Sequence, residues 1–108
     1  MENFAKIIGT GAYLPKKILT NTDLEKMVDT SNEWIVTRTG IQERHVAAKD
    51  ETPSTMGEKA ALMALANAKM KASDLELIVV ATCTPEKFLP STAALLQHRL
   101  GVGVCMAL

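Results

Sequence analysis

The chain has 108 residues, 47% of them hydrophobic and 22% charged, which is enough for about one domain with a single hydrophobic core. Its 12 basic side chains are balanced by 12 acidic ones, so its charge gives no reason to expect duplex nucleic acid or an anionic membrane surface as a partner. No apolar run approaches the roughly 20 residues of a membrane span, and the first residues do not form a secretory signal, so we expect a cytoplasmic protein.

The first apolar run, "AKIIGTGAYLP" at residues 5–15, ends in glycine and proline, a pattern typical of a short strand of about five residues. A short helix is expected next. Thr22 is followed three residues later by Glu25, the spacing of a capping box, in which each side chain bonds to the other residue's backbone amide. This pair predicts that the helix begins at Thr22.

The second helix is expected to contain the only tryptophan of the chain. Ser31 or Asn32 can cap its first turn, and Gly40 can end it in the left-handed conformation that favours glycine. Trp34 and Arg38 are four residues apart, the spacing of neighbours on one helix face. The sequence therefore predicts a large ring and a flat cation side by side, shortly before the helix ends.

Residues 41–48 alternate weakly between apolar and polar side chains, which favours a strand or an extended segment. Beyond a loop, Thr55 and Glu58 have the spacing of another capping box, which predicts the start of the longest helix, at residues 55–71. The small side chains of this helix form a low surface that is suited to close packing on a sheet: Ala60, Ala61, Ala64, Ala66 and Ala68.

Two further strands and a helix are predicted in the last third of the chain. The β-branched and apolar run at residues 75–84 does not alternate, as in a strand that is buried on both faces of a parallel sheet. Residues 91–101 predict a helix that begins at Ser91 or Thr92, and residues 102–108 predict the start of a third strand. This order indicates βαβ units, and hence an α/β fold with a parallel sheet.

Active sites of such sheets lie beyond the carboxyl ends of the strands. Those ends are expected near residues 9–13, near residues 82–85 and just past Leu108. "GTGAYL" begins like a dinucleotide-binding fingerprint, but Leu14 stands where the third glycine should be. The two glycines are more simply explained by a turn and tight packing.

The cysteines and histidines give weak signals. Cys83 lies at a strand end, where a nucleophile would be useful, but it runs into Pro85 rather than into a helix. Cys105 falls inside the last strand, and neither His45 nor His98 has a partner at metal-ligand spacing. We therefore expect structural roles for these side chains, and neither a metal site nor a covalently bound cofactor.

Two interpretations of Trp34 and Arg38 remain open from the pattern alone. In one, the tryptophan belongs to the core and the arginine is solvated. In the other, the ring and the guanidinium sandwich a flat base such as adenine, while the arginine reaches a phosphate. Hydroxyl groups of Thr30, Thr37 and Thr39 surround the same turn and could add donors.

With these residues laid out, the sequence strongly resembles the N-terminal part of the 3-oxoacyl-[acyl-carrier-protein] synthase III family, within the thiolase-like superfamily. The matching stretches cover nearly the whole chain in the family's order: "IIGTGAYLP", "TNTDLEKMVDTSNEWIVTRTGIQERH", "STMG", "LIVVATCT" and "PSTAALLQHRLG". The run from Asn32 to His45 is the most specific of them. The resemblance implies that residues 1–108 are an N-terminal segment of one half of a thiolase-like α/β domain.

The resemblance implies the initiating condensing enzyme of type II fatty acid synthesis. In this family a cysteine takes an acyl group, by default acetyl, from coenzyme A, and the acyl-enzyme condenses with malonyl-acyl carrier protein as carbon dioxide is lost. The family's nucleophile lies in a D-V-x-x-A-C motif that is expected just beyond Leu108, and its His and Asn lie farther on. Cys105 matches a non-catalytic position, so the chain alone is expected to be inactive and truncated before the nucleophile.

Individual positions also carry over from the family. Trp34 and Arg38 match the pair that sandwiches the adenine of coenzyme A, and Thr30 matches a residue beside that base. Leu89 matches a position often held by Phe, which reaches into the partner's acyl pocket in the family's homodimer. Because leucine has a different shape, a branched or longer primer than acetyl is also possible.

Two alternatives remain open beside this interpretation. The chain could be a truncated module without catalytic activity, or it could come from a sister condensing enzyme that primes a secondary metabolite and keeps the same adenine site. Reading the coding sequence past Leu108 distinguishes the first alternative from a complete enzyme.

Overall fold

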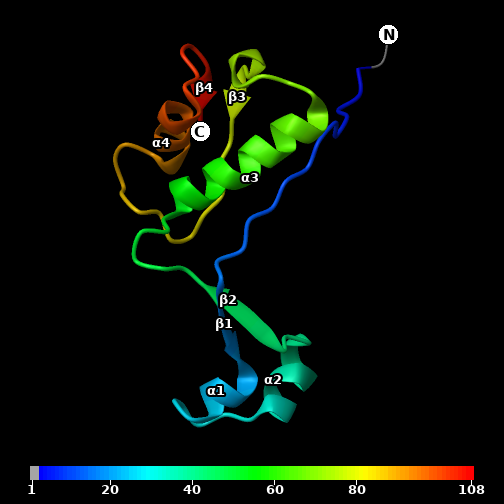
Figure 1. The fold of residues 1–108 in the computed structure, drawn as a ribbon, viewed down its shortest axis with the longest axis vertical. Helices are drawn as coiled ribbons and strands as arrows, with labels where there is room; N and C mark the ends of the chain where they lie inside the picture. Colours follow the sequence, from blue (N-terminus) through cyan, green and yellow to red (C-terminus); the bar gives the residue numbers. More distant parts are fainter. Residues whose placement is uncertain (1–2) are drawn as a thin grey trace. The chain divides into compact units, whose positions relative to one another are not determined.

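The computed structural model describes residues 3–108, which divide into two compact units (Figure 1). One unit is Leu14–Glu51, and the other combines residues 3–13 with Thr52–Leu108. In the described part of the chain, no helix combines the length and the apolar character needed to cross a bilayer. Each unit is described in turn because each has an interior of its own.

The unit Leu14–Glu51 is a two-stranded antiparallel ladder with two short helices at one end (Figure 1). Its elements are β1 (Lys17–Thr20), α1 (Asn21–Glu25), α2 (Asn32–Thr39) and β2 (Glu43–Val46). β1 pairs with β2 from Lys17 opposite Val46 to Thr20 opposite Glu43. The strand predicted within residues 41–48 is therefore confirmed, whereas β1 lies where no strand was expected.

The cap of the first helix, Thr20, lies two residues before the predicted cap, Thr22. Thr20 and Asp23 form the capping box of α1, instead of Thr22 and Glu25. The Thr20 amide and hydroxyl donate to an Asp23 carboxylate oxygen over 3.1 and 2.8 Å, and these bonds, together with Lys26, hold the pKa of Asp23 below its ordinary value. The two candidate boxes have the same chemistry, a threonine followed three residues later by an acidic residue. The path of β1 into the helix decides between them.

The second helix has the predicted ends. The Ser31 hydroxyl accepts from the amide of Trp34 over 3.1 Å, and Gly40 ends α2 with a φ of 72°. The side-chain nitrogen of Asn21 (Nδ2) donates to the Asn32 side-chain oxygen over 2.9 Å and to the Ile41 carbonyl over 2.7 Å. The side-chain oxygen of Asn21 accepts from Arg44 over 2.7 Å. This unit is thus closed by a buried polar network around Asn21, of which 1% is exposed.

The other unit holds the two longer helices and a second two-stranded sheet. Its elements are α3 (Pro53–Ala68), the 3₁₀ turn η1 (Ala72–Asp74), β3 (Leu77–Ile78), α4 (Thr92–Leu100) and β4 (Met106–Ala107). β3 and β4 are parallel, which confirms the predicted parallel pairing, and α4 connects them as a crossover. α4 has the predicted cap at Ser91 and ends at Gly101 with a φ of 68°. Ile78, Ala93 and Leu96 form the core of this unit.

The strand predicted within residues 5–15 is wrong for this structure. Residues 3–13 run without a ladder partner and lie along α3 (Figure 1). A Cβ on Gly9 would fall 2.4 Å from the Ala64 carbonyl oxygen, and one on Gly11 would fall 2.1 Å from that of Ala60. The predicted roles of these glycines in close packing, and of the alanines of α3 as a low surface, are confirmed, although a chain segment rather than a sheet covers them.

Two other boundaries differ from the prediction. α3 begins at Pro53 with Thr52 as its cap, in a capping box with Thr55, so Thr55 is the partner in the box rather than the cap. β3 is confined to two residues and is not buried on both faces, because Val79 is 66% exposed beside it. The uncovered face borders an aliphatic groove of about 440 Å³, which extends from Ile8 to Leu100.

Candidate functional site

Trp34 and Arg38 lie side by side on the outer face of α2. The Arg38 guanidinium carbon is 5.5 Å from the centroid of the Trp34 ring, within the range of a cation–π contact. The Trp34 side chain is 58% exposed, and Arg38 is exposed as well. The interpretation of Trp34 as a core residue is therefore wrong for this structure, since its ring is open to solvent.

The rotation of α2 explains why this ring faces outward. Ile35, the next residue along the helix, is the buried one, with 8% of its surface exposed. Successive helix positions are about 100° apart, so an inward Ile35 leaves the Trp34 ring pointing away from the interior.

The Trp34 ring borders two shallow hollows of about 320 and 370 Å³. Asp29, Thr30, Ser31 and Trp34 line the first, and Ser31, Glu33, Trp34, Thr37 and Arg38 line the second. Both hollows combine the ring with hydroxyl groups and carboxylates, and the second adds the guanidinium. Such a surface can stack a flat ring, hydrogen-bond to its edge and attract an anionic group, all within one turn of α2.

The structure separates the three threonines that surround this turn. Thr30 is half-buried in the first hollow, and Thr37 is exposed in the second. The Thr39 hydroxyl instead donates to the Ile35 carbonyl over 2.7 Å and accepts from the amide of Ile41 over 3.1 Å. Thr39 therefore satisfies the C-terminal end of α2, and its expected contribution as a free donor at the site is wrong.

The other candidate residues are not drawn into a common site by this structure. Leu89, in the other unit, is 87% exposed, Cys83 is exposed and Cys105 is half-buried. The His45 Nδ1 atom lies within hydrogen-bond distance of the Pro15 carbonyl, at 2.5 Å, and His98 lies on the surface of α4. Among residues 3–108, His, Cys, Asp and Glu side chains form no group of three that could hold a metal ion.

A polar cluster at the start of α3 was not predicted from the sequence. Its centre is Ser54, of which 1% is exposed. The Ser54 amide donates to Glu86 over 3.1 Å, and its hydroxyl accepts from the Arg99 Nε over 3.0 Å. A serine next to Pro53 in the first turn of a helix was the available signal, but the two charged partners are distant in sequence.

Comparison with known proteins gives a consistent result. No family model matches the chain. It is 59% identical over 108 residues to the beta-ketoacyl-[acyl-carrier-protein] synthase III of Oleidesulfovibrio alaskensis, covering 100% of this chain and 33% of that protein. The match to the corresponding protein of Xylella fastidiosa is 59% over 104 residues, covering 32% of its length.

The fold has the same relatives. The crystal structure of 3-oxoacyl-[acyl-carrier-protein] synthase III from Aquifex aeolicus superposes with a TM-score of 0.88 at 56% identity, over 94% of this chain and 33% of that one. The chain thus spans about a third of the length of the relatives it matches. These matches confirm the α/β, thiolase-like fold and show that the chain is similar to an N-terminal segment of the beta-ketoacyl-[acyl-carrier-protein] synthase III proteins.

Proposed function

We propose that the protein carrying this chain is an initiating condensing enzyme of type II fatty acid synthesis. Its first step would move an acyl group, by default acetyl, from the sulfur of coenzyme A to a cysteine thiolate, releasing coenzyme A as its thiol. In the second step malonyl-acyl carrier protein loses carbon dioxide, and the resulting carbanion attacks the thioester to free the cysteine. The names of the relatives at 53–59% identity support this assignment.

In this proposal the chain contributes the adenine site for coenzyme A. Trp34 stacks on one face of the purine, Arg38 covers the other face or pairs with a phosphate, and Thr30 lies beside the base edge. The observation that carries the assignment is the exposed ring with the guanidinium 5.5 Å from its centroid. A purine can stack on this exposed indole with a matching flat face.

The catalytic cysteine, histidine and asparagine are proposed to lie elsewhere in the protein. Cys83 and Cys105 are given no catalytic role. Among the described residues, no basic side chain forms a hydrogen bond with either thiol, and neither cysteine begins a helix. Residues 1–108 alone are therefore expected to be inactive. We further propose a cytoplasmic homodimer in which Leu89 enters the partner's acyl pocket.

A priming enzyme of secondary metabolism is the second candidate function. The crystal structure of a priming beta-ketosynthase from a polyketide biosynthetic pathway superposes with a TM-score of 0.87, but at 33% identity. The same adenine site would serve such an enzyme. The identities of 56–59% to the synthase III proteins favour fatty acid synthesis.

The adenine site is tested by replacing Trp34 in the enzyme that carries this sequence. Trp34→Ala should weaken acetyl-coenzyme A binding by about 1–3 kcal/mol, the range for a base stacked on an aromatic side chain, and Trp34→Phe should recover part of the loss. Isothermal titration with acetyl-coenzyme A gives the affinity. Decarboxylation of malonyl-acyl carrier protein by the acylated enzyme should change little. An equal loss in both steps, with a lower melting temperature, would show that Trp34 stabilises the fold instead.

A further inference from the structure

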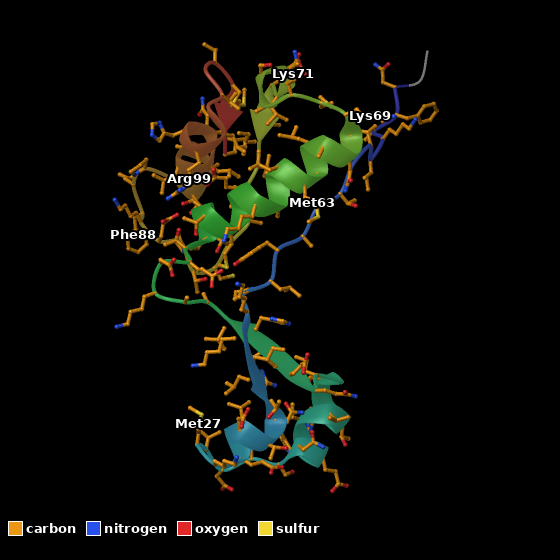
Figure 2. The ribbon with its side chains drawn as sticks, viewed as in Figure 1. Met27, Met63, Lys69, Lys71, Phe88 and Arg99 are labelled. Carbon is orange, nitrogen blue, oxygen red and sulfur yellow. The ribbon has the colours of Figure 1, made fainter. Side chains whose placement is uncertain are left out.

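The helix that carries Trp34 and Arg38 is too short to be stable by itself. α2 has eight residues, and isolated helices shorter than about 12–15 residues are marginal in water. Groups outside α2 must therefore hold it, and the buried Ile35 anchors only the middle of its inner face. Met27, just past the end of α1, points away from α2 and takes no part in this contact (Figure 2).

One side chain of α1 reaches both ends of α2. The Asn21 Nδ2 atom donates over 2.9 Å to the side-chain oxygen of Asn32, the first residue of the helix. The same atom donates over 2.7 Å to the carbonyl of Ile41, which follows the terminating Gly40. The Glu25 carboxylate adds a third bond, since it accepts from the Asn32 amide over 2.6 Å. Both ends of α2 are thus bonded to α1.

Arg44 fixes the orientation of the Asn21 amide. Its guanidinium donates to the Asn21 side-chain oxygen over 2.7 Å and to the Leu19 carbonyl over 3.2 Å. A guanidinium has no acceptor, so the atom of Asn21 that faces it is the oxygen, and Nδ2 is left facing the two ends of α2. Asn21 is 1% exposed and its partners belong to its own unit, so no further chain is needed to shield these bonds from water.

We propose that Asn21, oriented by Arg44, is a positioning residue that holds the Trp34–Arg38 face in the form that binds coenzyme A. This inference rests on the proposed function, in which that face takes the adenine. When a ligand binds only the held form of a helix, its apparent affinity falls with the fraction of molecules in that form. Removing a bond at one end of α2 lowers this fraction, so the affinity falls although no contact with the ligand is lost.

The experiment uses the full-length enzyme with variants at the start of α2. Asn32→Ala removes the acceptor for Asn21 and keeps the backbone bond to Glu25, whereas Asn32→Asp retains an acceptor. His45→Ala is the matched control, because it removes the contact with the Pro15 carbonyl in the same unit, near the end of the β1–β2 ladder that is away from α2. Amide hydrogen exchange of residues 32–39 needs no activity, and isothermal titration gives the Kd for acetyl-coenzyme A.

Asn32→Ala should accelerate exchange in residues 32–39 and raise the Kd by about three- to tenfold, the factor that corresponds to one ordinary hydrogen bond. Asn32→Asp and His45→Ala should stay close to the parent protein in both measurements. Unchanged exchange in Asn32→Ala would overturn the hold of α1 on α2, and faster exchange with an unchanged Kd would overturn its role in binding. An equal rise of the Kd in His45→Ala would show that any loss of stability in this unit weakens binding, which would also overturn the inference.

A double-mutant cycle separates this inference from the proposed function. In a Trp34→Ala background, Asn32→Ala should raise the Kd by a smaller factor than in the parent, because the stacking ring that the network positions is gone. Equal factors in the two backgrounds would contradict the positioning role. A Trp34→Ala enzyme with the parent Kd would instead refute the adenine site, and faster exchange in Asn32→Ala would then show that the hold on α2 itself is correct.

Asn21→Ala releases both ends of α2 and should raise the Kd further than Asn32→Ala does. An Asn21→Ala protein that folds and keeps the parent Kd would contradict the inference. If this variant does not fold, Asn32→Ala decides the question, because it removes one bond and leaves the bond from Asn21 to the Ile41 carbonyl in place.

Discussion

The two units of this chain reach stability in opposite ways. Leu14–Glu51 is closed by hydrogen bonds around the buried Asn21 and carries its tryptophan on the outside. The other unit has an apolar core at Ile78, Ala93 and Leu96, and its exposed apolar surface is an aliphatic groove. The two exposed apolar surfaces therefore differ in the groups around them. The groove is lined by aliphatic side chains, whereas Trp34 lies among a cation, carboxylates and hydroxyl groups that can recognise a polar ligand.

The largest effect should separate two neighbours on α2. Ile35→Ala removes a buried side chain and should lower the free energy of unfolding by about 3 kcal/mol. Trp34→Ala should change it by less than about 0.5 kcal/mol, because the ring is largely exposed. Urea unfolding followed by circular dichroism measures both. A larger loss for Trp34→Ala than for Ile35→Ala would reverse the assignment of the inner and outer faces of α2.

The polar interior can be tested by deleting one amide from each unit. Asn21→Ala leaves Arg44, Asn32 and the Ile41 carbonyl without this partner and should cost about 2–3 kcal/mol. Asn67→Ala is the control, since its side chain is exposed and donates to the Thr10 carbonyl over 2.8 Å. Trp34 fluorescence reports unfolding of its own unit. Equal shifts of this transition in both variants would show that the two units do not differ in the way described.

In the other unit, the sharpest test is close packing against α3. Gly11→Ala places a Cβ 2.1 Å from the Ala60 carbonyl oxygen and should cost about 2 kcal/mol, because backbone must move. Gly103→Ala is matched to it, since a Cβ there meets nothing within 4 Å. Thermal unfolding compares the two variants. If both melted alike, the contact of residues 3–13 with α3 would be contradicted.

The smallest loss of stability is expected for the two glycines that end helices, and it should be the same in both units. Gly40 and Gly101 end their helices with φ values of 72° and 68°, and a Cβ at either position meets no other atom within 4 Å. Replacing either by alanine should cost about 1 kcal/mol, the price of a left-handed residue with a side chain. Urea unfolding checks both. Costs that differ by more than about 1 kcal/mol would show that one helix end depends on more than its backbone conformation.

Local signals in the sequence predicted the parts of the fold that depend on local chemistry. The ends of α2 and α4 were correct because serine caps and left-handed glycines act within a few residues. The caps of α1 and α3 were wrong because Thr20 and Thr52 compete with Thr22 and Thr55, and the choice depends on the path of the preceding chain. The strand expected within residues 5–15 failed because a ladder needs a partner, which apolar character alone does not provide.

The candidate site was predicted in part. Helical spacing was sufficient to bring Trp34 next to Arg38, but it could not decide whether the ring faced inward, since that depends on which neighbour the interior accepts. Thr39 was expected as a donor, yet its hydroxyl satisfies the helix end. The Ser54 cluster was missed because Ser54 is 32 residues from Glu86 and 45 residues from Arg99, and such distant partners leave no local signal in the sequence.

The adenine site is tested most directly by a crystal structure of the enzyme that carries this sequence with coenzyme A bound. The account predicts the purine stacked on the Trp34 ring at van der Waals distance, with the Arg38 guanidinium over its other face or on a phosphate. A purine bound elsewhere, with the Trp34 ring covered by other parts of the protein, would contradict it.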